Sequence, residues 1–192
     1  MSDLTKKSSV KVFGGTQERW THRSAACDCT MTFSVFFPPA EGPTPVLYWL
    51  SGLTCTDENF ATKSGFARAA AAHGVTVVIP DTSPRGVDIE GQDDAYDFGS
   101  GAGFYVDATE PKCVPSPQAT AARPAGTPPL HATRHRWSGH YKMYSYITKE
   151  LPELVAAQFA GKVTAKRSIF GHSMGGAPGP RTRAHNSHPA AR

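Results

Sequence analysis

The stretch GHSMG, residues 171–175, constrains the fold of this 192-residue chain more than any other feature. It matches G-x-S-x-G, the pattern of a sharp turn that places a serine between a strand and a helix. The glycines let the turn close tightly, and the serine then lies at the carboxyl end of the sheet in a backbone conformation that most residues resist. The pattern therefore predicts a serine nucleophile at Ser173.

Strand-like and helix-like segments alternate along the chain. Four runs are typical of strands. In residues 31–38 apolar and polar residues alternate, as they do in a half-buried strand. The other three are the apolar runs Val46–Leu50 and Val75–Pro80 and the segment Arg167–Ser173. Two segments have helical spacing: Asn59–His73, which Gly74 would end in a left-handed cap, and Tyr144–Phe159, despite Pro152. This order predicts an α/β protein with a mostly parallel central sheet.

Two backbone amides are candidates to stabilise negative charge on a bound carbonyl oxygen. One is the amide of Met174, which follows the serine, and the other is expected in the loop LSGLTC, residues 50–55, because that loop also follows a strand. An ordinary turn without catalysis is the alternative, since a five-residue pattern is short. The strand that precedes the turn favours the nucleophile.

Charge and composition exclude several classes of function. The formal net charge is +4, but seven basic residues fall in two segments without acids, 112–136 and 177–192, so the rest of the chain carries −3. We therefore expect no nucleic-acid-binding face. No apolar run approaches the roughly 20 residues of a membrane span, and residues 1–12 lack the apolar block of a secretory signal. These features predict a soluble, cytoplasmic protein without membrane contact.

The cysteines and histidines do not predict a metal site. The spacing C-x-x-C of a structural zinc site is missing among the four cysteines, Cys27, Cys29, Cys55 and Cys113. We expect them to be reduced and mostly buried thiols. A further set fits no tetrahedral spacing and is interrupted by prolines: Cys113, His131, His135 and His140.

Two segments differ in composition from the rest of the chain. Residues 112–136 and 177–192 together hold eight of the sixteen prolines and four of the eight histidines, without hydrophobic periodicity. Such a composition is typical of disordered segments. We therefore predict one domain over residues 1–176, interrupted by a disordered insertion at 112–136, and a disordered tail at 177–192 outside the domain.

Six longer motifs carry a resemblance to a known family. They are YWLSGLTCTDENF, KSGFARAAAAHG, PDTSPRG, DFGSGAGFYVDATE, HYKMYSYITKELPELV and SIFGHSMGG. Over most of Lys11–Gly176, apart from the block 112–136, the chain resembles the S-formylglutathione hydrolase family, also called esterase D. The resemblance implies an α/β-hydrolase fold, a three-layer sandwich that is incomplete at its C-terminal side here, and a cytoplasmic, commonly dimeric enzyme.

The resemblance assigns roles to particular residues. It makes Ser173 the nucleophile and the backbone amides of Leu53 and Met174 the two donors to the oxyanion. Cys55 matches a cysteine near the family's active site, and it is either a thiol that modulates activity when oxidised or a buried packing residue. His172 is expected to pack against the turn or to orient it, because the general base must approach the serine from across the site.

The glycine-rich GSGAGF, residues 99–104, could suggest dinucleotide binding. No strand leads into it and no helix follows it, and such a site requires both. The resemblance places it instead in a loop near the active site, where glycines allow close approach of the backbone. We therefore expect no cofactor.

The family hydrolyses S-formylglutathione to glutathione and formate in formaldehyde detoxification, and it also cleaves simple carboxylesters. The resemblance implies that Ser173 attacks the thioester carbonyl, that the thiol leaves, and that water hydrolyses the formyl-enzyme. Two alternatives stay open: a general carboxylesterase, and a non-catalytic fragment that binds a full-length subunit.

The residues after Ser173 do not complete a catalytic triad. In this fold the acid and the histidine follow the serine in the chain. Only nineteen residues follow it here, and they contain His185 and His188 but no Asp or Glu. Pro178 and Pro180 also oppose the helix expected after the turn. We therefore expect this chain as it stands to be inactive or nearly so.

Overall fold

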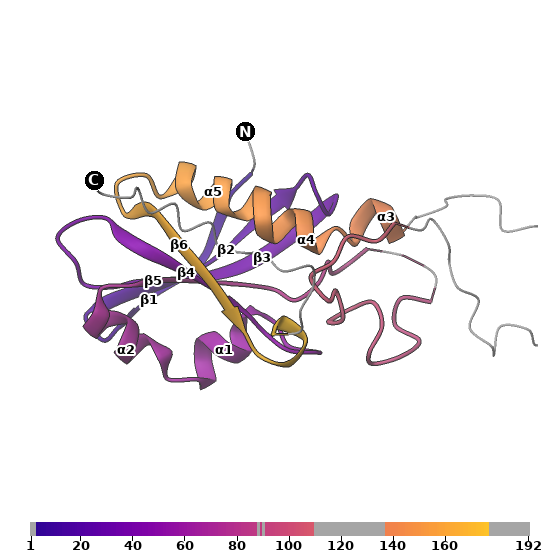
Figure 1. Ribbon diagram of the computed structural model, residues 1–192, viewed down its shortest axis with the longest axis horizontal. Coiled ribbons are helices and arrows are strands. Elements are labelled where there is room, and N and C mark those ends of the chain that lie inside the picture. Colours follow the sequence, from indigo (N-terminus) through magenta and orange to yellow (C-terminus); the bar gives the residue numbers. More distant parts are fainter. Residues whose placement is uncertain (1–2, 88, 90, 110–136, 177–192) are drawn as a thin grey trace, which may run out of the picture.

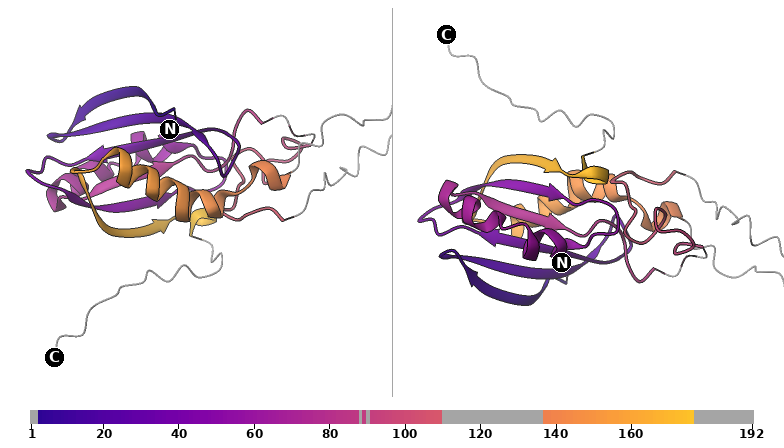
Figure 2. Two further views of the ribbon diagram at one scale, coloured as in Figure 1. Left: turned by 90° about the horizontal axis from the view of Figure 1, so that it is seen from above. Right: turned by 90° about the horizontal axis from the view of Figure 1, so that it is seen from below.

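The computed structural model describes residues 3–87, 89, 91–109 and 137–176, and this part of the chain folds around one six-stranded sheet (Figure 1). Its strands are β1 (Thr5–Val12), β2 (Gly15–Ser24), β3 (Cys29–Phe37), β4 (Thr44–Leu50), β5 (Thr76–Pro80) and β6 (Val163–Gly171). Their order across the sheet is β1-β2-β3-β5-β4-β6, so β1 and β6 are the edge strands. Figure 2 shows these two strands at opposite sides of the sheet.

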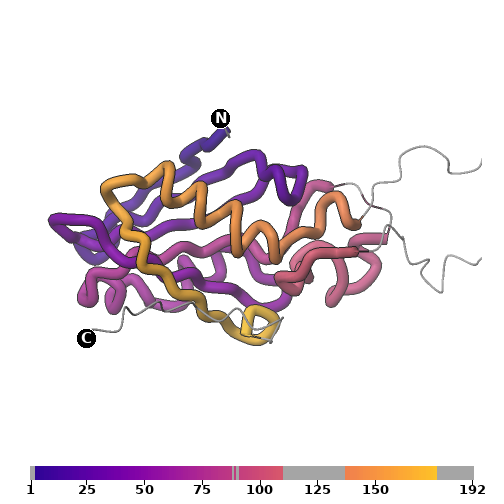
Figure 3. Tube along the Cα trace, turned by 45° about the horizontal axis from the view of Figure 1, so that its top comes forward, coloured from indigo at the N-terminus to yellow at the C-terminus, as the bar shows by residue number. Residues whose placement is uncertain are grey.

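Helices cover both faces of the sheet. They are α1 (Asp57–Lys63), α2 (Phe66–His73), α3 (Trp137–His140), α4 (Met143–Ser145), the π-helical turn η1 (Tyr146–Glu150), α5 (Leu151–Gln158) and the 3-10 turn η2 (Ser173–Gly175). Figure 1 shows α1 and α2 on one face and the run from α3 to α5 on the other, and Figure 3 shows this run lying along the sheet. The predicted α/β class with three layers is confirmed.

The sheet is mixed, whereas the sequence predicts a mostly parallel one. Strand β4 is parallel to β5 and β6, but the pairs β1–β2, β2–β3 and β3–β5 are antiparallel. A tight turn at Phe13 and Gly14, both with positive φ, joins β1 to β2 directly, so no crossover helix is needed. β1 was not predicted, because most of its residues are polar and exposed.

All four predicted strands are present, with one difference in burial. The segment 31–38 forms β3, but residues 33–37 are all buried, so β3 is not half-buried as its alternation predicts. Ser34 is tolerated there because its hydroxyl donates a 2.7 Å hydrogen bond to Asp57 at the start of α1. The predicted strand at 167–173 begins earlier and ends at Gly171.

The two predicted helices differ in how closely the structure follows them. The segment 59–73 is divided between α1 and α2, because Gly65 adopts a left-handed conformation with φ of 70°. Gly74 ends α2 in a left-handed cap with φ of 63°, as predicted. The helix predicted at 144–159 runs from α4 to α5, and Pro152 lies in the first turn of α5, where a proline is tolerated.

Two apolar layers fill the space between the sheet and its helices. The larger layer includes Tyr48 on β4, Met143, Tyr146 and Leu151 from the run α4 to α5, and Phe33 on β3. The smaller layer lies under α1 and α2 and is built on Phe36, Ala67, Ala70, Val77 and Ile79, with Trp49 and Phe60 packed against it. Successive residues of β4 therefore face different layers, as the pleat of a strand requires.

The carboxylate of Asp57 ties α1 to the antiparallel part of the sheet. It accepts hydrogen bonds from Arg19 Nε (2.8 Å) and Nη2 (2.9 Å) on β2 and from the Ser34 hydroxyl on β3. The Asp57 side chain is fully buried, whereas a third of the Arg19 side chain is exposed. The hydrogen bond to Asp57 raises the pKa of Arg19. The buried negative charge is thus fully paired.

A second long-range contact holds the turn between β2 and β3. The Glu150 carboxylate, at the end of the π-helical turn, accepts hydrogen bonds from the Ser24 hydroxyl (2.9 Å), the Ala25 amide (2.9 Å) and the Ala26 amide (2.7 Å). One carboxylate therefore satisfies three donors of this turn and links it to the helical layer.

Next to this contact lies the buried side chain of His22. Its Nε2 is 3.0 Å from the Tyr146 hydroxyl, and the two rings are stacked. Its Nδ1 has no hydrogen-bond partner among the described residues and lies 3.9 Å from Glu150. Burial lowers the pKa of His22 below its ordinary value of 6.5, and Glu150 opposes that shift.

We predict that Arg19→Ala destabilises the protein because it leaves the Asp57 carboxylate buried and unpaired. The free energy of unfolding should fall by about 2–3 kcal/mol, at the low end for a broken buried pair because Arg19 is partly exposed. Urea denaturation measures this. The control is Arg23→Ala, whose ion pair with Asp28 joins two mostly exposed side chains. An equal loss for both variants would contradict the prediction.

We predict that acid destabilises the protein partly through His22. Its pKa is lowered in the folded state, so the unfolded chain binds a proton at higher pH. The contribution to stability is therefore complete above about pH 6.5 and declines as the pH falls from there toward the folded-state pKa. Thermal unfolding between pH 7.5 and 5 measures it. His22→Gln, which cannot titrate, should show a flatter pH dependence, and an unchanged slope would refute this role.

Candidate active site

Ser173 lies at a strained turn between β6 and η2. β6 ends at Gly171, and η2 begins at Ser173, whose φ is +55°. This left-handed conformation is uncommon for a residue with a side chain and persists only where the surrounding structure enforces it. Ser173 is exposed, whereas the next residue, Met174, is buried. The hydroxyl is therefore accessible from solvent, as the G-x-S-x-G pattern predicts.

The glycines of the turn lie directly against the end of β4. A Cβ atom added at Gly171 would lie 2.6 Å from the Leu50 carbonyl oxygen, and one added at Gly175 would lie 2.6 Å from the Leu50 carbonyl carbon. The His172 amide donates a 3.1 Å hydrogen bond to the same Leu50 oxygen. Larger residues at either glycine would push the turn away from β4. The position of Ser173 thus depends on Leu50.

The loop that continues from β4 lies beside the serine. A Cβ atom added at Gly52 would be 3.2 Å from the Ser173 Cβ, so the two backbones are in close contact. The Cys55 amide donates to the Gly52 oxygen (3.3 Å), and Thr54 has a φ of +64°. This tight turn contains Leu53. Among the described residues, neither the Leu53 amide nor the Met174 amide donates a hydrogen bond, so both are available to an oxyanion.

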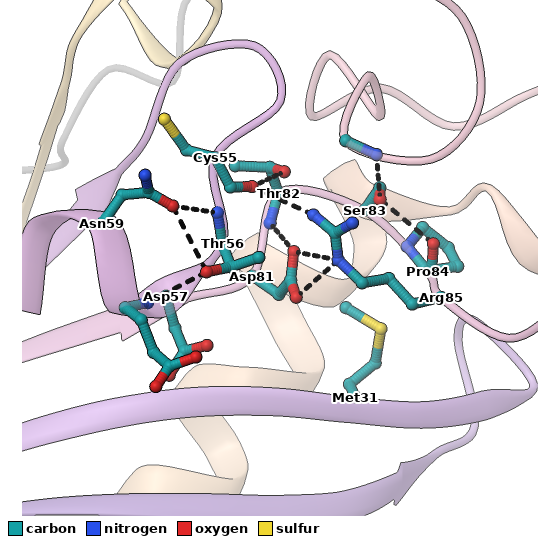
Figure 4. Close-up of polar contacts among 12 residues, drawn as sticks. Met31, Cys55, Thr56, Asp57, Asn59, Asp81, Thr82, Ser83, Pro84 and Arg85 are labelled. Carbon is teal, nitrogen blue, oxygen red and sulfur yellow. Dashed lines mark hydrogen bonds and ion pairs between the residues drawn. The ribbon is translucent and has the colours of Figure 1, made fainter. Parts of the chain in front are cut away.

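A polar network fixes the far side of this loop (Figure 4). The Cys55 carbonyl accepts hydrogen bonds from the Thr82 hydroxyl (2.5 Å) and from Arg85 Nη2 (3.1 Å). Arg85 Nε in turn donates to both oxygens of Asp81, at 3.0 and 2.8 Å. Burial raises the pKa of Asp81, and the Arg85 hydrogen bond counteracts that effect. The loop is therefore anchored to the residues that follow β5.

The glycine-rich segment 99–104 supports the same loop from another side. The Thr54 amide donates to the Gly101 oxygen (2.9 Å), and the Gly101 amide donates to the Ser83 hydroxyl (2.7 Å). A Cβ atom at Gly101 would lie 2.9 Å from the Thr54 Cα. The Tyr105 hydroxyl donates to the Ser51 carbonyl (2.9 Å). The prediction that these glycines allow close backbone approach near the site is confirmed.

The supporting residues were not predicted as part of the site. Asp81, Thr82 and Arg85 all belong to the motif PDTSPRG, which the sequence connects to the family only by resemblance. The sequence does contain one signal for this ion pair. Asp81 and Arg85 lie four residues apart directly after a buried apolar strand, and charged residues near a core are usually paired. Their role depends on a contact with residue 55, which the sequence does not reveal.

The histidines nearest to Ser173 along the chain are His172, His185 and His188. The His172 amide holds the turn to β4, and the His172 Nδ1 would lie 3.4 Å from a Cβ atom added at Gly52, so its exposed side chain lies beside the loop 50–55; a packing or orienting role stays a prediction. His185 and His188 lie outside the described residues. Within the described ranges, no side chain hydrogen-bonds to the Ser173 hydroxyl. The structure places the candidate nucleophile beside the loop that contains Leu53, since a Cβ atom added at Gly52 would lie 3.2 Å from the Ser173 Cβ.

The described cysteines are reduced and differ in exposure. Cys27 and Cys29 are buried, and burial raises their pKa values to about 12 and about 11. Cys55 is half-buried in the loop beside Ser173, and Cys113 lies outside the described residues. The expectation of free, mostly buried thiols is confirmed for the three described ones.

Two further properties concern the described part of the chain only. No three His, Cys, Asp or Glu side chains come together there as a metal-binding group, and of the predicted set only His140 is described, with Nδ1 2.9 Å from the Cys27 carbonyl oxygen. None of the helices there is long and apolar enough to cross a membrane.

Sequence comparison finds relatives along most of the chain. A family model described as "Putative esterase" matches residues 24–120 and 120–178. The S-formylglutathione hydrolase of Arabidopsis thaliana is 47% identical over 178 residues, which cover 91% of this chain and 54% of that protein. The S-formylglutathione hydrolase of Bos taurus is 50% identical over 176 residues, covering 90% and 53%. The chain thus spans about half the length of the curated relatives it matches.

Structural comparison gives the same answer. An S-formylglutathione hydrolase from Agrobacterium tumefaciens is 40% identical with a TM-score of 0.72, covering 90% of this chain and 54% of that one. A fluorophosphonate-binding serine hydrolase from Staphylococcus aureus is 18% identical with a TM-score of 0.52, covering 84% and 48%, and its likeness concerns the fold alone. The resemblance and the α/β-hydrolase fold predicted from the motifs are confirmed.

We predict that Cys55 reacts with iodoacetamide at pH 8 well before Cys27 and Cys29. The two buried thiols stay protonated because burial raises their pKa values, and reagent cannot reach them in the folded state. Peptide mass spectrometry after timed labelling measures the order. In urea all three should react at similar rates. Early labelling of Cys27 or Cys29 in the folded protein would show that this region opens readily.

Proposed function

Because this chain belongs to the esterase family, we propose that it carries the nucleophile and the oxyanion hole of a serine hydrolase that cleaves S-formylglutathione to glutathione and formate. The observation that carries the proposal is the exposed, left-handed Ser173 beside the unused amides of Leu53 and Met174. The choice of substrate is supported by the sequence identity of 47% and 50% to the S-formylglutathione hydrolases of Arabidopsis thaliana and Bos taurus.

In the proposed reaction, Ser173 Oγ attacks the thioester carbonyl and forms a tetrahedral oxyanion. The Leu53 and Met174 amides donate to that oxyanion, where preorganised donors are most effective. Collapse of the intermediate breaks the carbon–sulfur bond, and glutathione leaves as the thiol after protonation. Water then hydrolyses the formyl ester of Ser173 and releases formate. A general base must take the serine proton, and no side chain among the described residues hydrogen-bonds to Ser173 Oγ.

Three finer points rest on the same relatives. Cys55, half-buried in the loop beside Ser173, is a candidate thiol whose oxidation would alter the oxyanion loop. A cytoplasmic location and a homodimer are proposed from the family resemblance. A general carboxylesterase is the nearest alternative, and a preference for short acyl esters over the thioester would favour it.

We predict that the 192-residue polypeptide alone hydrolyses S-formylglutathione at least about 10⁴-fold more slowly than the bovine hydrolase, because the residues after Ser173 contain no triad acid. Loss of thioester absorbance measures the rate, and spontaneous hydrolysis gives the baseline. Turnover near that of the bovine enzyme, abolished by Ser173→Ala, would show that the chain finds its acid and base elsewhere.

The nucleophile itself is tested in a chimera. Residues 1–176 of this chain are joined to the part of the Arabidopsis relative that follows its own equivalent turn. We expect thioester hydrolysis, and Ser173→Ala should reduce kcat by about 10⁴-fold or more. Ser9→Ala, on the exposed edge strand β1, is the matched control and should leave kcat unchanged. An active chimera that tolerates Ser173→Ala would exclude Ser173 as nucleophile.

A further inference from the structure

Backbone strain among the described residues gathers at the candidate site. Six of these residues other than glycine have a positive φ. Two of the six, Phe13 and Asp28, lie in turns that join antiparallel strands, where a left-handed residue is ordinary. The other four are Thr54 in the loop 50–55, Ser173 itself, and the neighbouring pair Phe104 and Tyr105. Such outliers persist only where the surrounding structure enforces them, and they cluster at functional sites.

Phe104 and Tyr105 occupy the centre of a tight turn. The Val106 amide donates a 3.3 Å hydrogen bond to the Gly103 oxygen, which closes a four-residue turn around them. Their φ angles are 47° and 53°, and positive φ at both central positions is the pattern of a type I′ turn. Glycine, asparagine and aspartate usually fill these positions, because bulky side chains resist a left-handed backbone. Two aromatic residues therefore adopt this turn against their own local preference.

Contacts at both ends of the turn enforce its conformation. Gly103, which begins the turn, lies against the segment that follows β5, since a Cβ atom added there would be 2.6 Å from the Thr82 carbonyl oxygen. Val106, which ends the turn, accepts a 3.1 Å hydrogen bond from the Met143 amide at the start of α4. The turn is thus held between the segment after β5 and the helical layer.

The turn directs the Tyr105 side chain into the core. Tyr105 is 8% exposed, whereas Phe104 is 45% exposed. The Tyr105 hydroxyl donates a 2.9 Å hydrogen bond to the carbonyl of Ser51, which is buried, and no other group among the described residues donates to that carbonyl. Burial raises the pKa of Tyr105 above its ordinary value of 10, so the hydroxyl keeps its proton and remains a donor.

The Ser51 carbonyl belongs to the first peptide group after β4, and the next peptide group carries the Leu53 amide. The carbonyl of that second group, at Gly52, accepts the Cys55 amide at 3.3 Å. Because a trans peptide is planar, the Leu53 N–H points in the opposite direction, away from the Cys55 amide. Fixing the Ser51 carbonyl therefore limits rotation of the neighbouring group and of the amide that it carries.

We propose that Tyr105 is a positioning residue of the oxyanion hole. Its hydroxyl, placed by the left-handed turn at 104–105, fixes the Ser51 carbonyl and thereby the direction of the Leu53 amide. The inference rests on the proposed function, because it assigns a role within the same oxyanion hole. It also accounts for the strained turn, since the reach of a tyrosine side chain connects this segment to the end of β4. Tyr105 acts through the loop and not on the reacting atoms.

The test uses the full 192-residue chain and phenylboronic acid as the probe. Ser173 Oγ forms a bond to the trigonal boron, the serine proton passes to water, and the tetrahedral boronate carries the negative charge that an oxyanion hole stabilises. This adduct is reached at equilibrium without a general base, so its stability reports on the oxyanion hole. ¹¹B NMR measures its formation, and Ser173→Ala should abolish it.

Tyr105→Phe removes the hydroxyl and keeps the ring. We expect it to weaken the adduct about tenfold, because one oxyanion donor loses its fixed direction. In ¹⁵N–¹H spectra of the adduct the Leu53 amide should shift and the Met174 amide should not. The matched control is Tyr146→Phe, which removes another buried hydroxyl, 3.0 Å from His22 Nε2. It should lower stability in urea by a similar amount and leave both the adduct and the Leu53 resonance unchanged.

A second variant separates the hydroxyl from the turn. Phe104→Asn places a residue that tolerates a left-handed backbone at the strained position, so the adduct should be as stable as in the parent chain. Equal weakening in Phe104→Asn and Tyr105→Phe would assign the effect to the Phe104 ring and overturn the proposal.

Each remaining outcome also decides a point. An adduct of Tyr105→Phe as stable as that of the parent, or an equal loss in Tyr146→Phe, would overturn the positioning role. A Tyr105→Phe chain that does not fold would assign the hydroxyl to global stability and overturn it as well. A parent chain that forms no adduct at Ser173 would instead count against the proposed function, and the role of Tyr105 in the oxyanion hole would fall with it.

Discussion

The close approach of two glycines to the Leu50 carbonyl is the contact on which the site depends. Leu50 ends β4, and its carbonyl accepts the His172 amide while Gly171 and Gly175 lie against it. The residues that follow Leu50 form the loop of candidate donors, so the same point fixes both the serine turn and the oxyanion loop. Strain at Ser173 is therefore maintained by packing at the end of a neighbouring strand.

The loop of candidate donors has little freedom of its own. The Cys55 carbonyl accepts hydrogen bonds from residues that follow β5, and the Ser51 carbonyl accepts one from Tyr105. The Thr54 amide donates a hydrogen bond to the glycine-rich segment. Two separate parts of the chain, residues 82–85 and 101–105, thus converge on residues 51–55. Such support allows amides to point at a developing charge without reorganisation during reaction, and this is the main advantage of a preorganised site.

Much of this arrangement was predictable from local signals. The serine turn, the buried strand β5 and the left-handed cap at Gly74 follow from short patterns with strong backbone preferences. The burial of Ser34 was not predictable, since it depends on the contact of its hydroxyl with Asp57 at the start of α1. The same holds for Arg85, whose partner at residue 55 is near it only after folding. Local preference predicts elements, whereas tertiary contacts decide their ends and partners.

The carboxylate of Glu150 also has a consequence for how the chain is made. The donors it binds at residues 24–26 precede it by 124 to 126 positions. At ribosomal rates of about 5–20 residues per second, this interval corresponds to roughly 6–25 s of synthesis. Until Glu150 has been synthesised, the Ser24 hydroxyl and the Ala25 and Ala26 amides therefore lack this acceptor in the nascent chain. The contact between the β2–β3 turn and the helical layer therefore forms late during synthesis of the chain.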